Sequence, residues 1–499
     1  MQSVEALNRS SKYLAAFIQD NWTVSRSLTL NLGVRWEVDT PIIDANNRMN
    51  GFDPLAINPV SNTPGVIKFA GVNGWPEAPY DTDWNNFGPR LGFAWRPTGE
   101  KTVVRGGFGI MYGHPFDHGA PNAASLGFDT SLSLNSPDGG FSPPFLLKDG
   151  VPAIPNTSAP HNDSFGAVAP GMPVTTAVTY FDRNRPSGYA QQYNLGIQRQ
   201  VGKTMIAEVT YLGNLSRKLP NANLNINQIP AGKVTALAVQ ANRPFPQFNG
   251  VTRLFPAIGK SNYHAGLVSL TKRFSQGTQF NLNYTLAQFN SDADGGAAEE
   301  GNVGVYGDLY NRGRDYGPAG NDIRHAFKMS GVFELPVGRG KKFLSTGILG
   351  RVVGNWTLGT QMVVQSGAPV TVGTQTQNTN AFPAGGQRAD LIGDPKLSNP
   401  TPTKWFETAA FAQHAPGTFG NSPKGLVRGD GLFFVDLSLS KNIWLGDEER
   451  RLQLRIEAFN VTNHTNFNLP NASFGAASFG TITSARPARA LQLSARLQF

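Results

Sequence analysis

The chain has 499 residues, and its 43 Lys and Arg against 34 Asp and Glu give a formal net charge of +9. Charged residues make up only 15% of the sequence while aromatic residues reach 10%, a balance that excludes an intrinsically disordered chain. The 56 glycines and 35 prolines argue against a helical protein, and the lack of cysteine excludes disulfides and thiolate chemistry. Neither a membrane-spanning helix nor an N-terminal secretory signal is predicted.

Apolar and polar residues alternate with a period of two, which predicts strands with one apolar and one polar face. In 28–36 every even position is large and apolar, and every odd position is polar or glycine. The same pattern predicts about thirteen strands, or up to about sixteen if segments such as 175–181 contribute. The thirteen are 11–22, 25–37, 86–96, 101–112, 189–200, 203–213, 262–274, 278–289, 323–336, 351–365, 431–443, 449–462 and 486–499.

Strand length and face chemistry favour an all-β, transmembrane antiparallel β-barrel. The predicted strands are long enough to cross a bilayer at a tilt, and their apolar faces carry almost no charge. A barrel with lipid outside and water inside explains such faces better than a soluble β-sandwich does. In 28–36 the even positions are therefore expected to face lipid and the odd positions the lumen.

Short and long connections alternate along the chain, as they do in bacterial outer-membrane barrels. Connections 38–85, 113–188, 214–261, 290–322, 366–430 and 463–485 are long, with little periodicity, and are predicted to be extracellular loops. Large aromatic residues stand directly before short turns, which are predicted to be periplasmic. Trp22, Trp95, Phe274 and Trp444 are therefore expected to form an interfacial aromatic girdle.

Basic residues are spread over strands, turns and loops without forming a stripe, so no nucleic-acid partner is expected. Arg35, Arg90, Arg105 and Arg455 all fall on the polar strand face, where they are predicted to line a lumen. Basic loops are also suited to contact the phosphates of lipopolysaccharide at the cell surface.

Several blocks together resemble the C-terminal barrel of Oar-like TonB-dependent outer-membrane transporters. They are 13–22 running into 28–36, then 86–95, 102–109, 263–274 and 455–467, and the chain ends in Phe499. The resemblance implies one barrel domain over residues 1–499, located in the bacterial outer membrane and forming the C-terminal portion of a transporter. The family's N-terminal plug, through which the TonB complex would act, is not found in this sequence.

The resemblance also implies that outer-membrane lipid, lipopolysaccharide and the barrel-assembly machinery are partners, with Leu497 and Phe499 in the C-terminal assembly signal. An odd strand count places the start of the first strand on the extracellular side, whereas bacterial barrels normally have an even count. We therefore expect an incomplete barrel, an open sheet whose first and last strands are poorly paired.

No catalytic, cofactor-binding or metal-binding constellation is predicted, so the chain is not expected to be an enzyme. His114 and His118 flank Pro115 in a predicted loop rather than on a helix. The acidic cluster Asp292–Glu300 lacks the spacing of a calcium loop. The glycines at 106, 107, 109 and 113 fall on a strand with no helix after it, so close packing explains them better than phosphate binding.

Three interpretations stay open at this stage. The sequence favours a transporter barrel for uptake of a substrate that it does not identify. The first alternative is a structural or adhesive surface barrel whose long loops bind partners. The second is a soluble β-protein, such as a propeller or a sandwich array.

Overall fold

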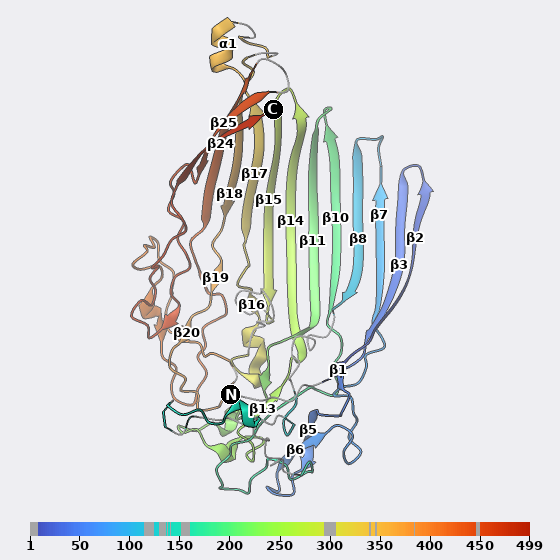
Figure 1. Cartoon of the computed structure of the whole chain (residues 1–499), viewed down its shortest axis with the longest axis vertical. Coiled ribbons are helices and arrows are strands. Elements are labelled where there is room, and N and C mark those ends of the chain that lie inside the picture. The colour runs from blue at the N-terminus through green and yellow to red at the C-terminus, as the bar shows by residue number, and fades with distance from the viewer. Residues whose placement is uncertain are drawn as a thin grey trace.

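A computed structural model describes residues 8–113, 124–128, 136, 138–139, 141–150, 160–293, 306–338, 341–344, 347–383, 385–445 and 450–499. Within these ranges fourteen strands form one main sheet, in which thirteen long strands follow one another in chain order (Figure 1). The short strand β16 (Gly317–Pro318) pairs with β15 beside this path. The thirteen are β2 (Tyr13–Ser25), β3 (Leu28–Asp39), β7 (Phe87–Trp95), β8 (Thr102–Tyr112), β10 (Tyr189–Val201), β11 (Met205–Pro220), β14 (Ala257–Ser275), β15 (Thr278–Ser291), β17 (His325–Glu334), β18 (Trp356–Gln365), β24 (Leu432–Trp444), β25 (Arg451–Phe459) and β27 (Ala490–Gln498).

The expectation of thirteen long, antiparallel strands is confirmed, and the chain is all-β apart from short helices. Several boundaries differ from the prediction. Residues 351–353 belong to helix α1 (Gly347–Val353), so that strand begins only at Trp356, and β11 continues to Pro220, beyond the predicted end at 213. The described residues also include 3-10 helices at Leu147–Asp149, Ala231–Lys233, Gln240–Asn242, Leu309–Asp315 and Thr408–Ala410. No described helix has the length and apolar character needed to cross a membrane.

All long strands are joined by turns at one end of the sheet and by long connections at the other (Figure 1). We call these the turn end and the loop end. Most turns are short, but the turn 335–355 is longer and includes α1. Small sheets form within the long connections: β1 (Arg9–Ser10) with β4 (Ile43–Asp44), β5 (Asn50–Ile57) with β6 (Pro64–Phe69), β19 (Pro369–Val370) with β23 (Val427–Arg428), β20 (Gly373–Thr374) with β26 (Ser473–Phe474), β21 (Asp390–Leu391) with β22 (Phe411–Ala412), and β12 (Leu224–Asn225), β13 (Gly250–Arg253) and β9 (Ala177–Tyr180) together. Residues 175–181 therefore supply a strand to a small sheet rather than to the wall.

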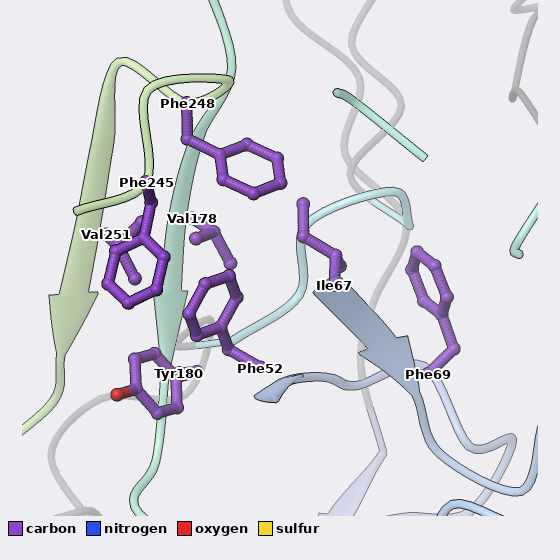
Figure 2. Close-up of a cluster of buried hydrophobic side chains, with 8 residues drawn as sticks. All are labelled: Phe52, Ile67, Phe69, Val178, Tyr180, Phe245, Phe248 and Val251. Carbon is purple, nitrogen blue, oxygen red and sulfur yellow. The ribbon is translucent and has the colours of Figure 1, made fainter. Parts of the chain in front are cut away.

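The long connections contain the most deeply buried hydrophobic clusters, although their sequences show little periodicity. One cluster joins three different connections and consists of Phe52, Ile67, Phe69, Val178, Tyr180, Phe245, Phe248 and Val251 (Figure 2). A second lies in the connection 366–430 and consists of Val372, Ala389, Phe406, Ala410, Phe411 and Val427, with Phe474 and Phe479 of the last long connection packed against it. The connections are thus a folded body beside the sheet, where the sequence suggested structureless loops.

The main sheet is open at both edges. Strand β2 pairs only with β3 and strand β27 only with β25, and every residue of both edge strands is exposed. The expected open sheet is therefore confirmed for the described residues, and no closed barrel forms.

Candidate functional site: the two faces of the sheet

The strand register defines two faces that run across the whole sheet. Residues directly opposite each other in an antiparallel pair point to the same face, so a face can be followed from strand to strand. Starting from Arg35, opposite Gly88, the path passes through Arg90, Arg105 and Thr210 and ends at Arg455, opposite Ser440 and Ser494. The four arginines singled out by the sequence thus share one face, which we call the polar face. The opposite one is the apolar face.

Three of these arginines lie on neighbouring strands β3, β7 and β8, whereas Arg455 lies far across the sheet on β25. The guanidinium of Arg35 donates from Nε to Glu37 Oε2 at 2.9 Å and from Nη2 to Tyr13 Oη at 2.6 Å. Arg455 Nε lies 3.7 Å from Glu457 Oε1. Carboxylates therefore accompany Arg35 and Arg455.

Cavities open on the polar face. One, of about 600 Å³, spans β11, β14, β15 and β17 and is lined by polar-face residues that include Asn214, Ser261, Asn283 and Lys328. A second, of about 350 Å³, lies over β15, β17, β18, β24 and β25. A third, of about 150 Å³, lies beside Arg35 and Arg90. Polar side chains and hollowed surface thus coincide on one side of the sheet.

The apolar face carries large hydrophobic side chains with no protein covering them. Examples in the middle of the sheet are Leu195, Val209 and Val268, whose side chains are at least half exposed. Glycine on this face leaves room for neighbouring rings, because a Cβ on Gly106 would lie 2.3 Å from the ring of Phe93. Close packing therefore explains this glycine. An uncovered apolar surface across an entire sheet requires an apolar solvent.

The four aromatic residues predicted as a girdle all lie at the turn end. Each is one of the last four residues of its strand. Trp22 and Trp95 lie on the apolar face, because both belong to the series opposite Leu28 and Leu30. Phe274 lies at a register shift between Lys272 and Ser275. Trp444 is different: it stands opposite Arg451, in register with the polar face, and its ring lies 5.9 Å from that guanidinium.

A second row of aromatic residues, which was not predicted from the sequence, lies on the apolar face between the middle of the strands and their loop end. Tyr211 Oη lies 2.8 Å from His264 Nδ1, and Tyr284 Oη lies 2.8 Å from His325 Nδ1 on the next pair of strands. Further members of the row are Trp36, Phe87, Tyr112, Tyr189 and Tyr193. Tyr and His side chains are both polar and aromatic, so the sequence alone does not assign them to one face of a strand. The row can be recognised only once the strand register is known.

Aromatic residues at the two ends of β7 enclose a band of bilayer dimensions. On β7, the side chains of Phe87 and Trp95 share the apolar face and are separated by about 27 Å along the strand. At a strand tilt of about 40° this is roughly 20 Å of height, close to the ~25 Å apolar band of outer-membrane barrels. Aromatic residues on the apolar face thus mark both ends of the strands.

The C-terminal strand β27 presents its apolar series at the free edge. Leu497 stands opposite Leu452, and the side chain of Phe499 is 93% exposed beyond the end of the strand. Both residues lie at the turn end.

The long connections are joined by buried polar contacts. Arg388 forms an ion pair with Asp315 from another connection, and Gln228 Nε2 donates to Asp308 Oδ1 at 2.7 Å. Burial raises the pKa of the Asp315 carboxyl, an effect that the Arg388 charge opposes. Burial also lowers the pKa of Arg243 to about 10. The guanidinium carbon of Arg243 lies 3.7 Å from the centre of the Phe382 ring. Such contacts fix the connections relative to one another.

Among the described residues, no group of three or more His, Asp or Glu side chains could hold a metal ion. His114, His118, Glu299 and Glu300, which the sequence analysis weighed as ligands, lie outside the described residues.

Comparison with known proteins gives one family and several distant structures. The sequence profile described as an outer membrane beta barrel domain matches residues 1–492. No curated protein matches the sequence.

The solved structures that the fold resembles are larger membrane proteins. The outer membrane transporter YddB from Escherichia coli shares 10% identity with a TM-score of 0.47, over 98% of this chain and 54% of that chain. The ferripyoverdine receptor of the outer membrane of Pseudomonas aeruginosa shares 11% identity with a TM-score of 0.45, over 99% of this chain and 39% of that chain. The FrpB iron transporter from Neisseria meningitidis shares 10% identity with a TM-score of 0.44, over 98% of this chain and 45% of that chain. The chain spans about half the length of these proteins or less.

Proposed function

Since the chain belongs to the outer membrane beta barrel domain family and is thereby a protein of the bacterial outer membrane, we propose that it forms part of the barrel wall of a TonB-dependent transporter. Its apolar face contacts lipid, and its polar face lines the lumen. The long connections form the extracellular side and the turns the periplasmic side.

One observation carries this proposal: the cavities lie on the polar face, and most of the uncovered hydrophobic side chains of the long strands lie on the other. A soluble sandwich would bury its apolar faces against each other. A barrel wall instead leaves its apolar face to lipid and encloses its polar face. In this arrangement Arg35, Arg90 and Arg105 form a basic patch on the lumen wall, suited to an anionic substrate or an acidic plug surface.

The edges of the sheet support a larger barrel. Strands β2 and β27 both run from the loop end to the turn end, because Tyr13 is paired at the loop end and Gln498 at the turn end. Direct pairing of these edges would be parallel, whereas all long pairs in the sheet are antiparallel. We infer that an odd number of further strands closes the wall. A plug within that barrel would be the part on which the TonB complex acts.

The size of the mature protein tests this proposal. We expect the protein extracted from native outer membranes to have an intact mass well above 53.7 kDa, with a plug and further strands in the additional sequence. Cross-linking from Arg90, replaced by a photoreactive residue, should then reach that plug. A mature product consisting of these 499 residues alone would contradict the transporter.

The folded connections favour one alternative, an adhesive surface barrel without transport. Their buried clusters make them a rigid body able to present a binding surface. An adhesin predicts loss of surface attachment when 366–430 is deleted, in a protein that has no plug. The intact mass separates the two functions.

A further inference from the structure

The turn 335–355 presents an exposed apolar surface at the turn end. Helix α1 lies in this turn and projects beyond the strands in Figure 1. Its side chains Ile348 and Val352 are 79% and 63% exposed, and Val353, Phe343 and Leu344 are about half exposed. Large apolar side chains gathered on one short segment call for a partner surface.

Contacts with the sheet place this segment beside the apolar face. Trp356 stands opposite Lys441, in the series that continues through Leu358 and Leu439 on the apolar face. The Lys441 ammonium lies 5.2 Å from the ring of Trp356 and donates a hydrogen bond to the carbonyl oxygen of Val352. The C-terminal end of α1 is therefore held at the turn end of the surface that, in the proposed function, contacts lipid.

The loop around the helix is held by backbone contacts and ion pairs. Phe343 N–H donates to Pro336 O at 2.9 Å, and Gly338 N–H donates to Phe343 O at 3.0 Å. Lys341 pairs with Glu334 at the end of β17. These bonds set the exposed side chains in place without covering them.

A cation accompanies the apolar side chains. The ammonium of Lys342 lies 5.3 Å from the ring of Phe343. An aromatic ring with a long basic side chain suits a headgroup region, where the ring meets the acyl boundary and the ammonium meets phosphate.

We propose that residues 341–344 and 347–353 form an interfacial anchor that inserts into the periplasmic leaflet of the outer membrane. The occupant of the patch is the lipid, because the patch continues the apolar face and carries a cation for anionic headgroups. The anchor would fix the turn end at the membrane surface. This inference rests on the proposed function, since it requires the apolar face to contact lipid.

Single-cysteine labelling tests the anchor, because these 499 residues contain no cysteine and any cysteine in additional sequence can be replaced by serine. Ile348→Cys would carry an environment-sensitive fluorophore, in protein purified from outer membranes and placed in phosphatidylethanolamine and phosphatidylglycerol vesicles. Leu195→Cys on the apolar face is the lipid-exposed control, and Leu237→Cys on a long connection, 75% exposed, is the water-exposed control.

We expect the Ile348→Cys label to show blue-shifted emission, to be quenched by nitroxide lipid and to be protected from iodide, as at position 195. Adding Val352→Glu should weaken the quenching by lipid. Iodide quenching equal to that at position 237, with position 195 still quenched by lipid, would overturn the anchor alone. Iodide quenching at both 195 and 348 would overturn the proposed function as well. Protection in native membranes that is lost in vesicles would mean that a protein covers the patch, and would also overturn the anchor.

Discussion

Phe52 and Phe245 meet edge to face, with ring centroids 5.1 Å apart and ring planes at 90°, although they come from different long connections (Figure 2). Both are almost fully buried, together with Phe248 and Tyr180. The contact is the centre of the cluster that makes the connections a folded body.

Replacing Phe52 with Ala should therefore unfold this body locally. Loss of a buried phenylalanine costs about 3–5 kcal/mol. We expect faster hydrogen exchange and new protease cleavage within 50–69 and 245–251, with unchanged strand content. Leu55→Ala is the control, because Leu55 is 85% exposed. Equal protease sensitivity of the two variants would contradict the buried cluster.

Asp44 should make the first long connection sensitive to acid. Burial raises the pKa of its carboxyl, but hydrogen bonds from Arg48, Asn46 and Asn8 outweigh that effect and hold the pKa below its ordinary value of 3.8. The stabilisation is then complete above that value and is lost as the pH falls through the lower pKa of the folded state. Asp44→Asn should remove about 1–3 kcal/mol at neutral pH.

Hydrogen exchange at the amides of Asn46 and Arg48 measures this effect. Protection in the parent protein should fall below about pH 4, whereas Asp44→Asn should have low protection at every pH. Glu100→Gln serves as the control, because Glu100 is exposed in the turn between β7 and β8, far along the chain from Asp44. A parent protein whose protection does not change between neutral and acid pH would show that Asp44 does not stabilise this connection.

Phe499 is predicted to act in assembly rather than in packing. Its side chain is 93% exposed, so its deletion should leave the stability of the folded sheet nearly unchanged. If it is part of an assembly signal, deletion should strongly reduce the amount of protein in the outer membrane, as measured by fractionation and immunoblotting. Gln498→Ala, one residue away, should have little effect. Equal amounts of both variants in the membrane would remove Phe499 from the signal.

The sequence was sufficient to predict the thirteen strands because one-sided burial imposes a period of two, which is local information. The body formed by the connections could not be predicted in this way. Phe52 and Phe245 lie in segments without periodicity, and only the fold brings them together. The row of Tyr and His side chains on the apolar face could not be predicted either, because it depends on the strand register. Trp444 was predicted to belong to the aromatic girdle because it stands directly before a turn. The strand register instead sets it opposite Arg451 on the polar face.

The assignment of the two faces is the central claim, and Val268 and Ser269 test it most directly. They are neighbours in the middle of β14: Val268 lies on the apolar face opposite Val209, and Ser269 lies on the polar face opposite Glu208. An arginine on the lipid face near the midplane costs about 2–4 kcal/mol, whereas one on the lumen face costs little.

The measurement is the free energy of unfolding of Val268→Arg and of Ser269→Arg in phospholipid vesicles, by denaturant titration. We predict that Val268→Arg lowers this free energy by about 2–4 kcal/mol and that Ser269→Arg leaves it within about 1 kcal/mol of the parent. Equal losses for the two variants, or a larger loss for Ser269→Arg, would contradict a sheet with one lipid face and one lumen face.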